Sequence, residues 1–137
     1  MAEMHVLSTG YVMAYINYVY TTHHKKGVIT MDANKVIEYF KAMNQIPRGS
    51  GNEKAVSDWL VQFAKDRNLD VLQDEANNVI IRKPATAGYE DRPAVILQGH
   101  MDMVCEKAAD STHDFTKDPI EHIMDGEWLH ANGTTLG

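Results

Sequence analysis

The sequence has little cysteine, no excess of basic residues and no long hydrophobic segment. Its single cysteine, Cys105, cannot form an intramolecular disulfide, so we expect a reducing compartment, the cytoplasm by default. With 19 acidic against 13 basic residues the formal charge is −6, which argues against nucleic acid or an anionic membrane surface as a partner. The apolar residues 11–20 make up about half the roughly 20 residues that a membrane span needs. Basic residues follow this stretch instead of preceding it, which is unlike an export signal.

The length and the residue usage are those of a soluble globular domain. The chain has 137 residues, and single domains commonly contain roughly 100–150. Hydrophobic residues make up 44% and charged residues 23%, which excludes a disordered or fibrous protein.

The first 30 residues differ from the rest of the chain. They contain four of the six tyrosines and show neither helical periodicity nor a capped helix start. Met31 is followed at once by well-patterned sequence. We therefore predict that residues 1–30 are an N-terminal extension and that the authentic start is Met31. The alternative is an edge strand or an ordered N-terminal arm.

Two amphipathic helices are predicted next. Asp32 is suited to cap the first helix, which extends to about Ile46 and has the apolar positions Val36, Ile37, Phe40 and Met43. The turn sequence of residues 47–51 follows, and Ser50 with Glu53 has the spacing of a capping box for the second helix. That helix is expected to end near residues 67–68 and to pack its apolar face on a sheet.

Three strands are predicted after the helices, at residues 70–73, 78–82 and 94–98, the first two as a hairpin feeding the third. Residues 94–97 are apolar at every position, which is typical of a strand inside a sheet with helices on both sides. A short segment at residues 120–128 follows, with a turn at Asp125 and Gly126. The order of elements predicts an α/β fold, and the Gly-rich end at residues 129–137 suggests a truncated domain.

A histidine and a carboxylate lie at the end of the third predicted strand. His100 and Asp102 are two residues apart, so an extended backbone directs both side chains to the same side. A metal-ligating histidine usually donates its second ring N–H to a carboxylate, which fixes the tautomer. The pair thus suits a metal site, although the spacing alone equally fits a structural ion pair.

The residues around this pair resemble a known family. VILQGHMDMV, residues 95–104, resembles the first metal-binding motif of the zinc metallopeptidases that include aminoacylases and carboxypeptidase G-like enzymes. Further blocks narrow the resemblance to the bacterial aminoacyl-histidine dipeptidases (Xaa-His dipeptidase, peptidase D) over residues 31–137. These blocks are IPRGSGNEKAVSDWL, NNVIIRKPATAGYEDRPAVILQGHMDMVCEK, HDFTKDPI and DGEWLHANGTTLG.

The resemblance implies the N-terminal part of a three-layer α/β metallopeptidase catalytic domain of the phosphorylase/hydrolase-like fold. It makes His100 a ligand of one of two Zn²⁺ ions, with Co²⁺ or Mn²⁺ as substitutes, and it makes Asp102 the residue that orients the imidazole. It implies two-metal hydrolysis of small dipeptides and a homodimeric full-length protein. In the family, GTTLG is followed by Ala-Asp-Asn/Asp-Gly with a metal-bridging aspartate, and the catalytic glutamates lie further on. The isolated chain is therefore expected to be inactive.

Other interpretations remain open at this stage. The chain is alternatively a non-enzymatic α/β interaction module, or a related aminoacylase or tripeptidase of the same fold. Cys105 lacks a neighbouring base at a recognisable spacing, so we expect a buried small hydrophobe rather than a nucleophile. The strand at residues 94–98 is expected to expose an apolar face that residues beyond Gly137 would cover.

Overall fold

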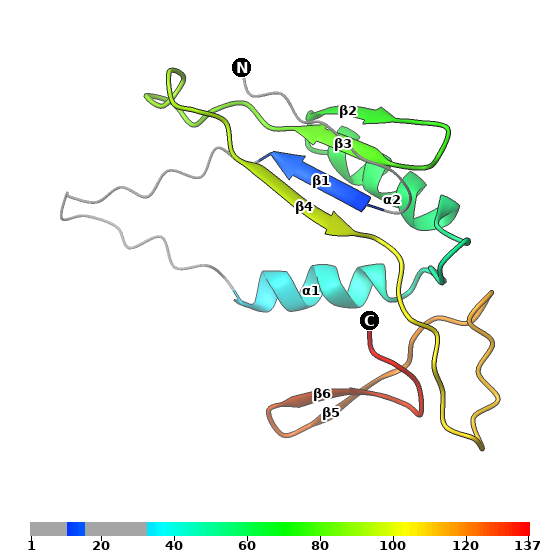
Figure 1. Ribbon diagram of the computed structural model, residues 1–137. Coiled ribbons are helices and arrows are strands. Elements are labelled where there is room, and N and C mark those ends of the chain that lie inside the picture. The colour runs from blue at the N-terminus through cyan, green and yellow to red at the C-terminus, as the bar shows by residue number, and fades with distance from the viewer. Residues whose placement is uncertain (1–10, 16–32) are drawn as a thin grey trace.

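Figure 1 shows the computed structural model of the chain, which describes residues 11–15 and 33–137. Helices α1 (Ala33–Met43) and α2 (Lys54–Lys65) accompany a four-stranded sheet and a separate hairpin. The sheet has the order β2-β3-β1-β4, and its strands are β1 (Tyr11–Tyr15), β2 (Asp70–Gln73), β3 (Val79–Arg82) and β4 (Ile96–His100). This mixture of helices and strands confirms the predicted α/β class. No helix in the described ranges is long and apolar enough to cross a membrane.

Strand β1 comes from the segment predicted to be an extension. It pairs parallel with β3 and antiparallel with β4, so it joins the β2–β3 hairpin to β4 (Figure 1). Within the described sheet it is therefore an internal strand. The predicted start at Met31 and the predicted cap at Asp32 lie outside the described residues, and the division of the chain after residue 30 stays a prediction.

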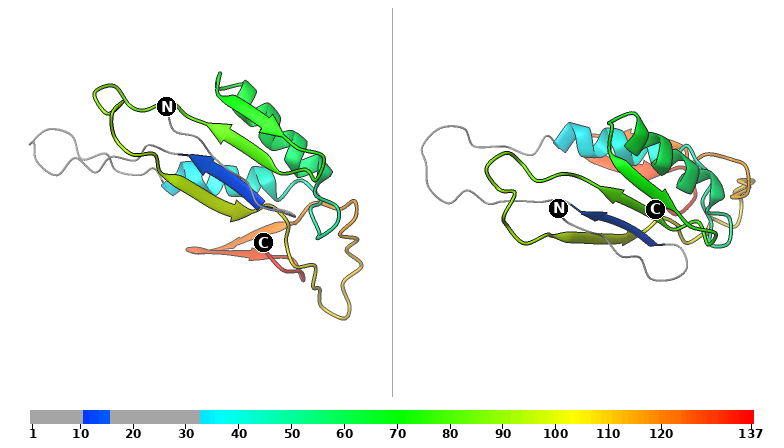
Figure 2. Two further views of the ribbon diagram at one scale, coloured as in Figure 1. Left: turned by 45° about the horizontal axis from the view of Figure 1, so that its top comes forward. Right: turned by 90° about the horizontal axis from the view of Figure 1, so that it is seen from above.

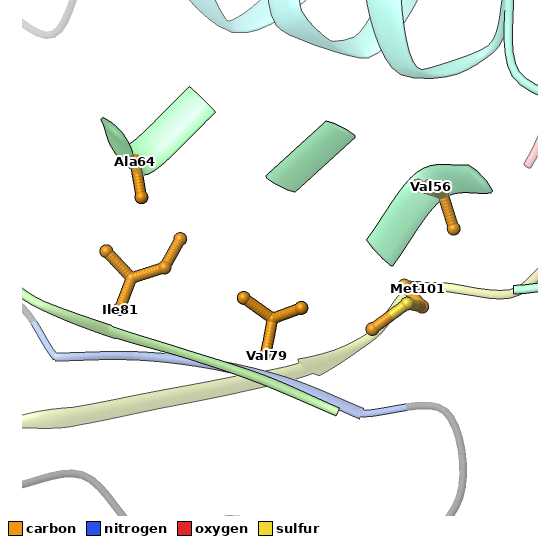
Figure 3. Packing of buried hydrophobic residues seen from close by; sticks show 5 residues of the cluster. All are labelled: Val56, Ala64, Val79, Ile81 and Met101. Carbon is orange, nitrogen blue, oxygen red and sulfur yellow. The ribbon is translucent and has the colours of Figure 1, made fainter. Parts of the chain in front are cut away.

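The core forms where α2 packs on the sheet. Val56 and Ala64 of α2 are fully buried against Val79 and Ile81 of β3, and Met101 closes the cluster at the end of β4 (Figure 3). Fully burying an aliphatic side chain of this size contributes about 1.5–3 kcal/mol. These contacts confirm that the second predicted helix packs its apolar face on a sheet, and they fix α2 relative to the segment that follows β4.

Helix α1 forms as predicted but is less well covered. Both helices lie on the same side of the four-stranded sheet (Figure 2). No residue of α1 is buried, and Val36 and Ile37 are 50% and 42% exposed. The apolar stripe of α1 thus lacks a full set of partners among the described residues.

Strand β4 corrects one prediction. It begins at Ile96, two residues later than expected, and it lies at the end of the described sheet rather than inside it. Helix α2 contacts β2 and β3, and no described helix covers β4, so Ile96 and Leu97 remain 48% and 45% exposed. A pattern that is apolar on both faces indicates which surfaces can be buried, but it does not supply the elements that bury them. The expected exposure of an apolar face is confirmed.

One hairpin was predicted in the right place, and a second forms where only a turn was predicted. Strands β2 and β3 pair antiparallel, and the Asp74 side chain accepts hydrogen bonds from the backbone N–H groups of Ala76 and Asn78 at the turn. Strands β5 (His122–Asp125) and β6 (Trp128–Ala131) form the second hairpin, in which Gly126 adopts a φ of 59°. Glycine tolerates this left-handed conformation at low cost, as the predicted turn requires.

Candidate metal centre

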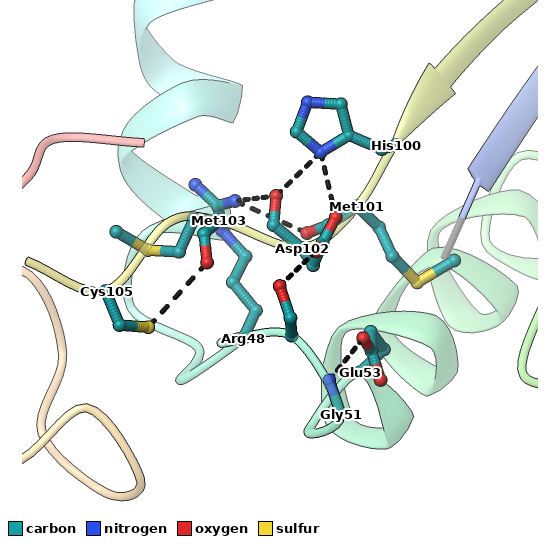
Figure 4. Close-up of polar contacts among 9 residues, drawn as sticks. Arg48, Gly51, Glu53, His100, Met101, Asp102, Met103 and Cys105 are labelled. Atoms are coloured by element: carbon teal, nitrogen blue, oxygen red, sulfur yellow. Dashed lines mark hydrogen bonds and ion pairs between the residues drawn. The ribbon is translucent and has the colours of Figure 1, made fainter. Parts of the chain in front are cut away.

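His100 and Asp102 are in direct contact where β4 ends. Nδ1 of His100 lies 2.9 Å from Oδ1 and 2.9 Å from the backbone oxygen of Asp102 (Figure 4). Both oxygens can only accept, so Nδ1 carries a proton, and in the neutral imidazole Nε2 then keeps its lone pair. The imidazole is 65% exposed, whereas the Asp102 side chain is 25% exposed, and Nε2 points away from the carboxylate (Figure 4). The predicted proximity is therefore present, and the free nitrogen faces outward.

Ser50 contacts the other oxygen of the same carboxylate. Its hydroxyl donates to Oδ2 of Asp102 at 2.5 Å, so the two carboxylate oxygens have different partners. This contact contradicts the predicted capping box. Helix α2 begins at Lys54 without a side-chain cap, and Glu53 instead accepts from the backbone N–H of Gly51. The turn at residues 49–52, closed by a bond from Asn52 N to the Gly49 oxygen, carries Ser50 away from the first helical turn.

The surroundings keep the carboxylate charged. The hydrogen bond from Ser50 is the main reason why the pKa of Asp102 lies below its ordinary value, and the hydrogen bond from His100 lowers it further. Partial burial of the Asp102 carboxylate raises this pKa, against the effect of the hydrogen bonds. Asp102 is therefore an ionised acceptor at neutral pH, as the orientation of a neutral imidazole requires.

Arg48 fixes the backbone beneath this pair. Its side chain is buried, and Nη1 donates to the backbone oxygens of Met101 and Asp102 at 3.3 Å each (Figure 4). Nη2 donates to Oδ1 of Asn44 at 2.7 Å, and the Arg48 oxygen accepts from Met103 N at 3.0 Å. Burial lowers the pKa of Arg48, while the charge of Asp102 opposes this effect. One guanidinium thus ties the segment after β4 to the segment after α1.

Asn44 extends these contacts to the last residues of the chain. It is 1% exposed, and its Nδ2 donates to the Leu136 oxygen at 2.8 Å and lies 3.1 Å from Nε2 of His122. The Thr135 hydroxyl donates to the Val104 oxygen at 2.6 Å. A Cβ on Gly137 would lie 3.2 Å from Nη2 of Arg48. Residues 135–137 are therefore held beside the segment that carries His100 and Asp102.

Cys105 is exposed, so the expectation of a buried small hydrophobe was wrong. The residue follows Val104 out of the core, and only its thiol packs inward, towards Gly49 and the Met103 oxygen. Desolvation raises the pKa of the Cys105 thiol, which disfavours the nucleophilic thiolate. The exclusion of a nucleophilic role therefore has a physical basis in the site.

The described residues fit a metal ion only in part. An imidazole nitrogen with a free lone pair and a carboxylate on the opposite nitrogen is the donor arrangement that zinc favours. Within residues 11–15 and 33–137, however, no group of three or more His, Cys, Asp and Glu side chains lies together. Catalytic zinc sites usually have about three protein ligands. His100 thus fits as one ligand, and the others have to come from elsewhere.

The fold and the site together define an α/β domain that presents an oriented histidine at a strand end. Comparisons with known proteins agree, although no protein-family model matches. The crystal structure of aminoacylhistidine dipeptidase from Vibrio alginolyticus superposes with a TM-score of 0.69 at 37% identity, over 82% of this chain and 23% of that one. The cytosol non-specific dipeptidase of Escherichia coli (strain K12) is 48% identical over 100 residues, 73% of this chain and 21% of that protein. A probable carboxypeptidase of Aspergillus niger is 28% identical over 105 residues, 70% of this chain and 25% of that protein.

The chain is therefore homologous to the dipeptidases of the aminoacyl-histidine dipeptidase type, as its motifs indicated. It spans about a fifth of the length of the dipeptidases it matches. The roles of individual residues, the metal and the substrate are taken up below as proposals.

Proposed function

We propose that this chain forms the N-terminal part of the catalytic domain of a bacterial, cytoplasmic, metal-dependent dipeptidase that hydrolyses Xaa-His type dipeptides. The observation that carries the proposal is the oriented imidazole of His100, with Nδ1 on Asp102 and Nε2 free. It lies in a chain that is 48% identical to a cytosol non-specific dipeptidase. A reducing location agrees with the single cysteine.

In this proposal His100 holds one of two zinc ions through Nε2, and Asp102 orients it. Zinc, when bound, polarises a scissile carbonyl and makes water a stronger nucleophile at neutral pH. The described residues have a different task, which is to present Nε2 in one direction and in one tautomer. The ionised Asp102 achieves this through Nδ1, and Arg48 keeps the Asp102 backbone in place. Co²⁺ and Mn²⁺ are suited to the same nitrogen donor and are proposed as substitutes.

The remaining ligands are proposed to follow Gly137. Asn44 holds the Leu136 oxygen, and Gly137 lies against Arg48, so residues that continue from there would start beside the His100 segment. In the family, the next motif is Ala-Asp-Asn/Asp-Gly with the metal-bridging aspartate. One histidine does not complete a site, so the 137-residue chain alone is expected to be inactive.

The test is hydrolysis of Xaa-His dipeptides, carnosine included, by the purified natural gene product. We expect activity that a chelator abolishes and that Zn²⁺, Co²⁺ or Mn²⁺ restores. His100→Ala should lower kcat/KM by about 100-fold or more, a loss at or beyond the upper end of the range for weakened metal sites. His130→Ala is the matched control, since His130 is exposed on β6 and should leave kcat/KM unchanged. Activity that survives chelation, or equal activity of both variants, would refute the proposal.

The same assay separates the alternatives. The likeness to a probable carboxypeptidase gives a related peptidase specificity some support. Cleavage of tripeptides or acylated amino acids in preference to dipeptides would assign the chain to that alternative. A gene product that cleaves none of these would favour the non-enzymatic interaction module. A homodimer of the natural gene product is also proposed, and light scattering measures it directly.

A further inference from the structure

We propose that Ser50 is a positioning residue of the His100 site. Its hydroxyl holds the Asp102 carboxylate in the orientation in which Oδ1, beside the Asp102 backbone oxygen, accepts the proton of His100 Nδ1. The consequence for metal binding rests on the proposed function, whereas the order Ser50, Asp102, His100 rests on the described contacts alone.

The contacts divide the carboxylate between two partners. Oδ1 of Asp102 accepts from Nδ1 of His100 at 2.9 Å (Figure 4). Oδ2 accepts from the Ser50 hydroxyl at 2.5 Å. The terminal torsion of an aspartate has a broad energy well, so one hydrogen bond defines its carboxylate plane poorly. A second hydrogen bond on the other oxygen defines that plane. Ser50 therefore determines the direction from which Oδ1 meets the imidazole.

The backbone of Ser50 is placed for this task. Gly49 forms a bridge with Met103, and Met103 N donates to the Arg48 oxygen at 3.0 Å, so the turn and the Asp102 segment run side by side. A Cβ at Gly49 would lie 2.7 Å from Sγ of Cys105, which shows how closely the two segments approach. Ser50 itself caps no helix, since α2 has no side-chain cap. Its hydroxyl is thus committed to Asp102.

The chemical result is a choice of tautomer. A histidine without a carboxylate partner exchanges its proton between the two ring nitrogens, and the Nε2–H form offers no lone pair on that side. A fixed acceptor at Nδ1 selects the form whose Nε2 binds a metal. Removing the Ser50 hydroxyl leaves Asp102 in place but frees its carboxylate to rotate. The Asp102 backbone oxygen then remains as the fixed acceptor at Nδ1, so the selection weakens.

The experiment measures the His100 tautomer by ¹⁵N NMR in the metal-free natural gene product with labelled histidine. The His100 signals are assigned by their loss in His100→Gln. We expect a dominant Nδ1–H form in the wild type, a shift towards Nε2–H in Ser50→Ala, and recovery in Ser50→Thr, which restores a hydroxyl. Ser57→Ala is the matched control, because the Ser57 hydroxyl donates to the Asn77 oxygen at 2.7 Å in the core and does not touch His100. The control should lower stability without changing the tautomer.

Zinc affinity gives the second measurement, by competition with a chromophoric chelator. Outer-sphere partners of a ligand histidine typically contribute about 10–100-fold in affinity, so Ser50→Ala should lose about tenfold and Ser50→Thr should regain it. The proposal is overturned if Ser50→Ala keeps the wild-type tautomer, or if Ser57→Ala shifts it equally. Failure of the dipeptidase proposal gives a different pair of results. In that case His100→Ala leaves zinc binding and hydrolysis unchanged, while Ser50→Ala still shifts the tautomer of His100.

Discussion

Replacing Arg48 by methionine should destabilise the protein strongly. The guanidinium is buried and joins two segments: it donates to the Met101 and Asp102 oxygens after β4 and to the Asn44 side chain after α1. Methionine has a similar length and fills most of the space, but it has no donor. The substitution thus removes the hydrogen bonds and changes the packed volume only slightly.

The magnitude follows from the three bonds. Hydrogen bonds from charged donors contribute about 1.5–3 kcal/mol and ordinary ones about 1 kcal/mol. The two bonds to the Met101 and Asp102 oxygens are long, 3.3 Å each, so we assign roughly 1 kcal/mol to each of them. The 2.7 Å bond to Asn44 is assigned roughly 2 kcal/mol. Removing the guanidinium also removes the desolvation cost of a buried charge, which offsets roughly 1 kcal/mol. The expected loss in the free energy of unfolding is therefore about 3 kcal/mol.

Urea unfolding of the natural gene product measures this loss, with Arg67→Met as the matched control. Arg67 is exposed, donates to the Phe63 oxygen at 3.0 Å and stacks on the Phe63 ring at 3.5 Å. Its replacement should lower the free energy of unfolding by less than about 1 kcal/mol. Equal losses for the two variants would refute the assigned role of Arg48 as a buried tie between segments.

Three further predictions concern other parts of the chain. Gly49→Ala should cost about 1–3 kcal/mol by overpacking against the Cys105 thiol, and adding Cys105→Ala should recover most of it in urea unfolding. Burial lowers the pKa of His122, so its stabilising effect is complete above pH about 6.5 and is lost as the pH falls below that. His122→Gln should therefore reduce the loss of stability between pH 7 and 5, and an unchanged pH profile would contradict this. Deleting residues 1–30 removes β1 and leaves β3 and β4 with unpaired edges, so size-exclusion chromatography should show aggregates; an unaggregated protein would instead support a start at Met31.

The sequence predicted where helices and strands lie along the chain better than it predicted which elements become their neighbours. Residue patterns located both helices and the β2–β3 hairpin, because local residue spacing determines which face of an element is apolar. It misplaced β4 at the centre of the sheet, because the apolar run at residues 96–97 carries no information about which strand becomes its neighbour. Strand β1 occupies that neighbouring position and comes from a segment without a clear pattern.

The candidate site shows the same division. The contact between His100 and Asp102 is local and was predicted from a two-residue spacing. Ser50 was assigned to a helix cap, since its spacing to Glu53 gave no sign of a carboxylate 52 positions along the chain. Arg48 and Asn44 were also missed as parts of the site. The role of Arg48 becomes visible only in the fold, where its side chain is buried and donates to the Asp102 oxygen. Long-range polar contacts of this kind leave no periodic signal.

The central claim is that Nε2 of His100 binds zinc while Asp102 holds Nδ1. The most direct test is anomalous diffraction at the zinc edge from crystals of the natural gene product grown with Zn²⁺. The account predicts a peak at the usual zinc–nitrogen distance of about 2.0–2.1 Å from Nε2 of His100, with Nδ1 still on Asp102. A zinc peak elsewhere with none at His100, or a peak at Nδ1, would contradict it.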